Sequence, residues 1–252
     1  MTFRPGIRIL PAALVFTVLA LSAAFHFCEG PAISASAQER SNDGPPVVKI
    51  TAPGNNSTYS WNSLVNYSVV VSYLGKSTQY QEIPSSQVLL TARYVPDLST
   101  SQATPATTRP SAGLLDITRS NCLGCHEFRA KAMGPSFAAI AERYPDNQAS
   151  IDALSRSIRE GSTGVFGPAS MPPHPEFTKD QLHAMVLWMV QDAANPNVNY
   201  YVGTEGAIRM QAPTAPNPQG GMILTASYTA PGPSANSEQA PMGEDTVIVH
   251  GR

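Results

Sequence analysis

Two cysteines and a histidine form the stretch of this sequence with the clearest chemical potential. Cys122 and Cys125 are separated by two residues, and His126 follows the second cysteine directly. This spacing is typical of c-type haem attachment, in which each thiol adds to a vinyl group and the adjoining imidazole ligates the iron. A thioredoxin-like redox pair is expected within a βαβ unit, and a zinc site needs a second pair of ligands. The sequence shows neither pattern, so we predict haem attachment.

An iron held by His126 also needs an assignment on its opposite face. Met171 lies in the proline-rich stretch 167–175, which we predict to be a helix-free loop that brings a thioether to that face. His174 is the alternative ligand, and an open position is the third possibility. Met133 is too close to His126 in the sequence to swing to the opposite face. Methionine or a second histidine would give an electron carrier, whereas an open face permits ligand or peroxide chemistry.

The amino terminus has the pattern of an export signal, which we assign to residues 1–37. Arg4 and Arg8 provide a positive start, residues 9–27 are apolar, and Ala35-Ser36-Ala37 offers a small-residue cleavage site. We therefore expect an exported, periplasmic protein. An uncleaved segment would instead anchor the protein in the membrane.

The remaining cysteine and the charge narrow the classes of protein further. Cys28 follows the apolar stretch, where it could be a lipid-attachment site, but the bulky residues before it argue against that signal. If Cys28 is removed with the signal, only the motif cysteines remain and no structural disulfide can form. The net charge of -2 and the lack of a Lys/Arg cluster exclude a nucleic-acid partner.

Two segments at the ends of the chain alternate apolar and polar residues with a period of two, which is typical of half-buried strands. The first is 45–95 and the second is 200–252, and a polar, unpatterned linker is expected at 96–110. The clearest strand includes Val65, Tyr67, Val69 and Val71 on one face. Trp61 is expected to pack on the same sheet.

Helical patterns occupy the middle, which we assign as a domain at 111–195. We expect helices at about 112–121, from Phe137 to about Tyr144, across Ile151 to Ile158, and after Thr178. Thr178 and Gln181 form a capping-box pattern, and Gly161 stands where a left-handed cap would end the preceding helix.

Size links the two β-patterned segments. Each has about 50 residues, which is too few to bury a core easily, whereas together they match an immunoglobulin-like sandwich. We therefore predict an α+β multidomain chain in which a small all-α domain is inserted into one β-sandwich. Two separate β modules flanking the helices are the alternative.

The middle of the chain resembles a class I monohaem cytochrome c. The resemblance covers about residues 111–194 and lies in Cys122–His126, in Gly134-Pro135-Ser136-Phe137, in Met171-Pro172-Pro173 and in the capped last helix. It implies one covalent haem c with His126 and Met171 as ligands and the Pro135 carbonyl orienting His126.

The same resemblance places Leu114 and Trp188 where the first and last helices meet, with Trp188 beside the apolar stripe of its helix. The flanking segments are similar to the PKD or immunoglobulin-like pieces of bacterial exported cytochromes associated with sorbosone-type sugar dehydrogenases.

The expected function is therefore single-electron transfer, without substrate turnover, between a periplasmic quinoprotein sugar or alcohol dehydrogenase and a terminal acceptor. The alternatives are a peroxidase-like haem enzyme, or a scaffold whose sandwich recognises a protein or carbohydrate.

Overall fold

The computed structural model describes residues 44–99, 109–212, 217–231 and 240–252. The predicted export signal, Cys28 and most of the predicted linker lie outside these ranges. Within the described ranges, no helix combines the length and apolar character needed to cross a membrane.

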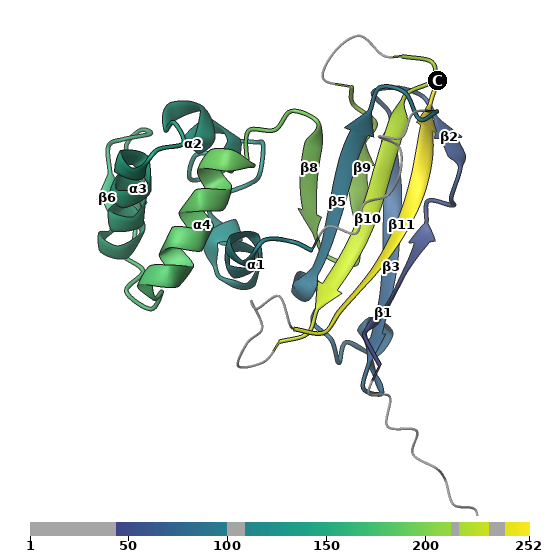
Figure 1. Cartoon of the computed structure of the whole chain (residues 1–252), viewed down its shortest axis with the longest axis horizontal. Helices are drawn as coiled ribbons and strands as arrows, with labels where there is room; N and C mark the ends of the chain where they lie inside the picture. Colours follow the sequence, from purple (N-terminus) through teal and green to yellow (C-terminus); the bar gives the residue numbers. More distant parts are fainter. Residues whose placement is uncertain (1–43, 100–108, 213–216, 232–239) are drawn as a thin grey trace, which may run out of the picture. The chain divides into compact units, whose positions relative to one another are not determined.

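The strands form two larger sheets and one short ribbon (Figure 1). The four-stranded sheet contains β1 (Val47–Ala52), β3 (Leu64–Tyr73), β4 (Lys76–Ser77) and β9 (Glu205–Arg209). The five-stranded sheet has the order β2 (Ser57–Tyr59), β11 (Met242–Gly251), β10 (Gly221–Thr229), β5 (Val88–Val95) and β8 (Val198–Val202). The ribbon pairs β6 (Ser162–Thr163) with β7 (Ser170–Met171).

Strands from both ends of the chain share both larger sheets. β10 pairs antiparallel with β5, from Gly221 opposite Val95 to Tyr228 opposite Val88. β9 pairs antiparallel with β3, with Ile208 opposite Val65. The two β-patterned segments of the sequence are therefore joined by hydrogen-bonded ladders.

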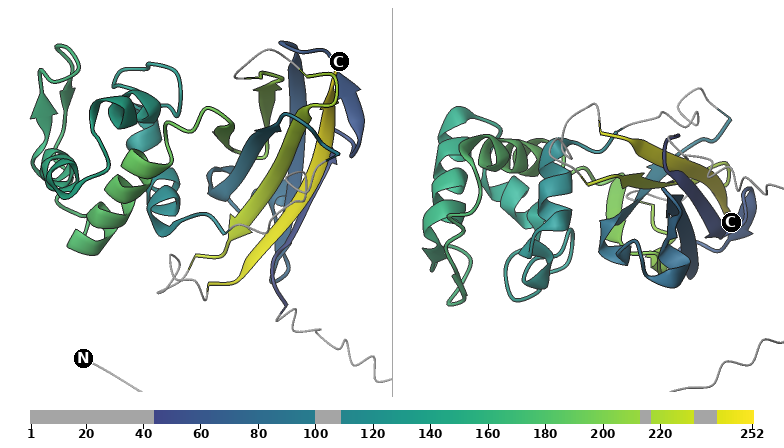
Figure 2. Two further views of the ribbon diagram at one scale, coloured as in Figure 1. Left: turned by 45° about the horizontal axis from the view of Figure 1, so that its top comes forward. Right: turned by 90° about the horizontal axis from the view of Figure 1, so that it is seen from below.

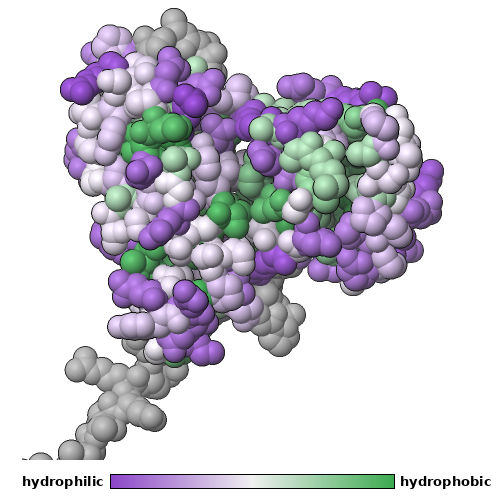
Figure 3. Space-filling view, turned by 180° about the vertical axis from the view of Figure 1, so that it is seen from behind, coloured by the Kyte–Doolittle hydropathy of each residue, from purple (hydrophilic) through white to green (hydrophobic). Residues whose placement is uncertain are grey.

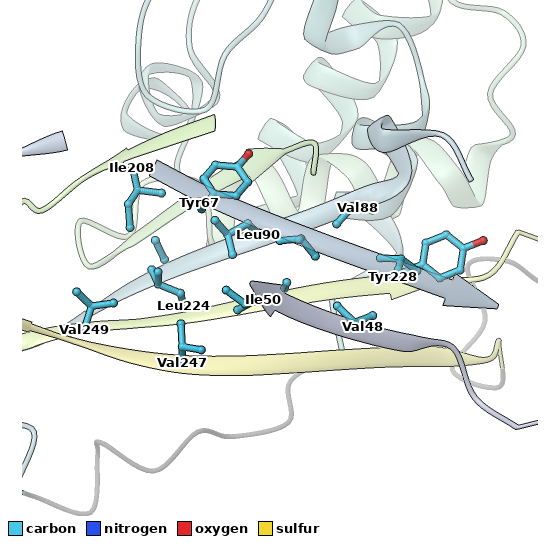
Figure 4. Close-up of a cluster of buried hydrophobic side chains, with 14 of the residues drawn as sticks. Val48, Ile50, Tyr67, Val88, Leu90, Ile208, Leu224, Tyr228, Val247 and Val249 are labelled. Carbon is cyan, nitrogen blue, oxygen red and sulfur yellow. The ribbon is translucent and has the colours of Figure 1, made fainter. Parts of the chain in front are cut away.

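Alternate side chains of these strands fill the space between the sheets. In β3, Val65, Tyr67, Val69 and Val71 are buried, as the period of two predicts. Figure 4 shows Tyr67 and Ile50 approaching Leu90 and Leu224 of the other sheet. Trp61 packs edge to face on Tyr94 of β5, with ring centroids 5.8 Å apart, and so lies against the core that the two sheets share.

Four α-helices make up the middle of the described chain, and in both views of Figure 2 they form one group and the strands of the two larger sheets another. They are α1 (Ala112–Arg119), α2 (Phe137–Arg143), α3 (Gln148–Glu160) and α4 (Lys179–Gln191). Short 3₁₀ turns occur at Thr78–Tyr80, Ser85–Gln87 and Cys122–Gly124.

Side-chain caps define where the helices begin. Ser111, Ser136, Asn147 and Thr178 each accept a hydrogen bond from a backbone N–H of the first turn. The capping box of Thr178 and Gln181 is confirmed, since each side chain bonds the backbone of the other residue.

Two details of the helical part differ from expectation. Gly161 ends α3 with φ 84° and ψ 166°, so it has a positive φ but not the left-handed helical conformation. Trp188 is not beside the buried face of α4 but within it, with 3% of its surface exposed. The indole is buried because residues outside the helix pack against it, which helical periodicity alone does not register.

Candidate haem-attachment site

The attachment motif folds into a tight turn that gathers its three reactive side chains. The N–H groups of Cys125 and His126 both donate to the carbonyl of Cys122, at 3.1 and 3.0 Å. The side chains of Cys122, Cys125 and His126 consequently line one cavity. Met171 and His174 line the same cavity, although they follow the motif by a helix-rich stretch of the chain.

The imidazole of His126 is held by one hydrogen bond and one ring contact. Its Nδ1 lies 2.7 Å from the carbonyl oxygen of Pro135. Because a carbonyl can only accept, Nδ1 carries the proton and Nε2 keeps the lone pair that a metal needs. Phe137 stacks on the ring, with centroids 5.4 Å apart and planes inclined by 26°.

Gly134 allows the chain to pass close to this imidazole. Its N–H donates to the carbonyl of Cys125 at 2.8 Å, which folds the following loop back over the motif. A Cβ atom at this position would lie 2.6 Å from Cε1 of His126. The side-chain-free residue therefore sets how near Pro135 can come to the ring.

Met171 is presented by the β6–β7 ribbon, where the sequence predicted an irregular loop. Met171 pairs with Ser162, and Gly161 turns the chain at the base of the ribbon with φ 84°. A Cβ atom on Gly161 would lie 2.9 Å from the carbonyl oxygen of Met171. The ribbon formed because Gly164 and Gly167, both with positive φ, allow the chain to reverse between its strands.

His174 also reaches the cavity, but its ring already has a partner. Its Nδ1 lies 2.9 Å from Oε1 of Glu176, and the hydrogen bond from His174 lowers the pKa of that carboxyl. Its backbone N–H donates to the carbonyl of Ile158 at 2.9 Å, which ties this end of the loop to α3.

The chemistry of the cavity suits a large apolar macrocycle with a central iron. Its walls are mainly apolar, and include Phe137, Ile140, Leu154, Ile158 and Met189. Cys122 and Cys125 are not joined in a disulfide, so both sulfurs are available for thioether bonds. In the part of the chain that the structure describes, no cluster of three His, Cys, Asp or Glu residues could hold a bare metal ion.

Apolar residues also reach the surface of the helical part. In Figure 3 they gather there as a green area ringed by hydrophilic residues. Among the exposed large apolar side chains are Met133 and Val165, which both line the cavity. Met133 lies on the motif side, where its sulfur is 3.9 Å from Sγ of Cys125.

Sequence reasoning missed the support behind the imidazole. Phe137 and Phe128 both pack on Trp188, with ring centroids 5.7 and 6.0 Å away, and Tyr200 of β8 packs on the indole at 5.6 Å. The clustering of aromatic residues on both sides of the motif and after α4 was the available signal.

The helices and the cavity together define a small c-type haem domain. Comparison with known proteins gives the family: the family model "Cytochrome c" matches residues 116–192. Cytochrome c-552 of Hydrogenobacter thermophilus is 31% identical over 86 residues, which are 31% of this chain and 87% of that protein. Cytochrome c-552 of Nitrosomonas europaea is 32% identical over 72 residues, 29% of this chain and 70% of that protein.

Among solved structures, wild-type Nitrosomonas europaea cytochrome c552 is 31% identical and has a TM-score of 0.29, covering 30% of this chain and 93% of that one. The sequence similarity shows that the chain belongs to the cytochrome c family. It carries covalently bound haem c and is a haem-binding electron carrier.

Proposed function

We propose that the chain is an exported cytochrome c that transfers single electrons through one haem ligated by His126 and Met171. The observation that carries this proposal is the placement of both side chains on one cavity together with Cys122 and Cys125. The hydrogen bond from His126 Nδ1 to Pro135 adds support, because it leaves Nε2 free to ligate.

Each residue has a defined task in this proposal. Cys122 and Cys125 would hold the haem, each through a thioether formed by adding its S–H across a vinyl group, with no change of oxidation state. Pro135 accepts from His126 and increases electron donation by the imidazole. Met171 offers a neutral thioether, which favours the reduced state relative to a second histidine. When bound, the haem supplies the one-electron exchange between ferrous and ferric iron.

Sequence features support the proposed location and partners. The pattern of residues 1–37 supports export to the periplasm, with a membrane anchor if the segment is not cleaved. The family resemblance supports a quinoprotein sugar or alcohol dehydrogenase as the donor and a terminal acceptor protein as the recipient. Such redox partners make small, transient contacts with a carrier.

We further propose that segments 45–95 and 200–252 form one immunoglobulin-like sandwich with the cytochrome c domain, 111–195, inserted between β5 and β8. The ladders that join β3 to β9 and β5 to β10 support a single sandwich. The antiparallel sheets are accompanied by one parallel pairing, of β2 with β11. An inserted domain would explain why β5 and β8 pair although the whole helical part separates them.

Replacing Met171 by alanine tests the iron ligation. We expect haem to remain attached, while the methionine-to-iron charge-transfer band disappears and the reduction potential falls. The measurements are protein mass, visible spectrum and potentiometric titration.

Met133→Ala is the matched control, since Met133 lines the same cavity but sits on the motif side. His174→Ala separates the two candidate ligands. An unchanged spectrum in Met171→Ala would refute Met171 as an iron ligand. Loss of the low-spin spectrum in His174→Ala would instead identify His174 as the ligand. A high-spin ferric spectrum of the unmodified protein would favour the peroxidase-like alternative.

A further inference from the structure

The loop that follows the haem-attachment motif is fixed to the edge strand of the five-stranded sheet. From Arg129, Nε donates to Oδ1 of Asn199 at 2.9 Å, and Nη2 donates to the carbonyl of Val198 at 2.7 Å. Nη2 also donates to the carbonyl of Asn195. One guanidinium therefore bonds three acceptors, two at the start of β8 and one in the residues just before it.

The backbone of the same loop holds the turn that carries Pro135. The N–H of Phe137 donates to the carbonyl of Glu127 at 3.0 Å, and the N–H of Ala138 donates to that of Phe128 at 3.1 Å. Residues 127–129 are thus bonded on one side to the start of α2 and on the other side to β8. A displacement of this loop would move Pro135 relative to His126.

Aromatic packing forms a second connection from β8 to the imidazole. Tyr200 packs on Phe128 with ring centroids 5.4 Å apart and edge-on against Trp188 with centroids 5.6 Å apart. Phe128 and Trp188 both contact Phe137, which stacks on His126.

The buried core is continuous across the same contact. Leu89 of β5 is buried in one cluster with Leu114, Phe137 and Trp188, and Tyr200 and Val202 of β8 pack against that cluster. Burial of this kind resists sliding of one part on the other more strongly than exposed hydrogen bonds do.

We propose that β8 supports the proximal side of the haem site, and that Arg129 and Tyr200 are positioning residues for the hydrogen bond between His126 and Pro135. The inference rests on the proposed ligation of iron by His126. A short bond from Nδ1 to the carbonyl makes the imidazole a stronger donor and stabilises ferric iron. Loosening the loop weakens that bond on average, so the reduction potential rises.

Arg129→Ala tests the proposal, with Lys131→Ala as the matched control. Lys131 is an exposed cation in the same loop, and replacing either residue removes one positive charge from the neighbourhood of the iron. Loss of a nearby cation alone stabilises ferric iron and lowers the potential. The positioning role predicts the opposite sign for Arg129→Ala. Its reduction potential should rise, whereas that of Lys131→Ala should fall.

Three further measurements complete the test. Hydrogen exchange at the amides of Gly134 and Phe137 should be about tenfold faster in Arg129→Ala and unchanged in Lys131→Ala. Arg129→Lys should restore part of the potential shift, because an ammonium can still reach a carbonyl. Tyr200→Ala, which removes the ring that packs on Phe128 and Trp188, should also raise the potential, by less than Arg129→Ala does.

Equal falls of the potential in the two alanine variants, with unchanged exchange, would overturn the proposal. If Arg129→Ala does not fold, Asn199→Ala removes one of the three acceptors and gives the same comparison. Failure of the proposed function is recognised separately: the spectrum of the unmodified protein would then lack histidine–methionine ligation.

Discussion

At the scale of the residue, the haem site depends on a glycine, which has no side chain, as much as on the residues that carry the chemistry. Cys122, Cys125 and His126 supply the attachment chemistry, but the imidazole is oriented only because Gly134 lets the chain bring Pro135 to 2.7 Å from Nδ1. The orientation of the ligand is thus determined by backbone geometry next to it.

Gly134→Ala should alter the haem site without abolishing attachment. The added Cβ would lie 2.6 Å from Cε1 of His126, so the ring or the loop must shift and the bond to Pro135 lengthens. We expect a higher reduction potential and about 1–3 kcal/mol of destabilisation, measured by potentiometry and denaturant titration.

Gly124→Ala provides the control inside the motif. Apart from its chain neighbours, a Cβ placed there would meet no atom of the described residues within 4 Å. The substitution should therefore leave the potential of the haem unchanged. Equal behaviour of the two variants would show that the contact between Gly134 and His126 is unimportant.

At the scale of the element, the crossing of α1 and α4 shapes the helical part. Gly113 lies at this crossing, where a Cβ would be 2.0 Å from the carbonyl oxygen of Ala184. Leu114 and Ile117 of α1 are buried in one cluster with Leu182 and Met185 of α4. The glycine allows the backbones to touch and these side chains to interlock.

Gly113→Ala should destabilise the helical part although alanine favours a helix. The substitution gains about 1 kcal/mol of helix propensity, but the clash with backbone atoms forces the helices apart and costs about 1–3 kcal/mol or more. We expect a lower free energy of unfolding by denaturant titration, with the haem spectrum as a local probe.

Gly54→Ala is the comparison for this variant, because its Cβ would have open space around it: within the described ranges, only its chain neighbours lie closer than 4 Å. The free energy of unfolding should change little. A stabilised Gly113→Ala protein would show that the helix crossing tolerates the added methyl group.

At the scale of the whole molecule, strands from both ends of the chain depend on one another. β5 lies between β10 and β8, and β3 pairs with β9. The segment 45–95 therefore lacks most of its hydrogen-bonding partners without the strands that follow residue 195. Three or more strands with a covered apolar face are normally needed for independent stability.

Truncation after Asn195 should therefore unfold the first β segment. We expect segment 45–95 to lose amide dispersion in NMR spectra and cooperative thermal unfolding, since β5 loses both neighbours. Dispersed, cooperative behaviour of residues 38–95 alone would contradict the single-sandwich proposal. The full chain serves as the reference for both measurements.

Much of this protein could be predicted from local sequence. The Thr178–Gln181 capping box and the 3.6-residue period located the helices because these signals act within one turn of the chain. The period of two in β3 predicted its buried face for the same reason. The cysteine spacing predicted haem attachment, since the reacting groups are neighbours in sequence.

Two features were decided by the tertiary structure because they depend on residues far apart in the sequence: the strand β8 and the burial of Trp188. β8 was missed because all five of its residues are partly exposed, so its sequence carries no alternation, and its pairing with β5 spans the helical part. Trp188 is buried by Phe128, Phe137 and Tyr200. These residues lie outside α4, so the periodicity of that helix does not predict the burial. The sequence alone determined the attachment chemistry, whereas long-range packing determined which residues hold the proximal histidine in place.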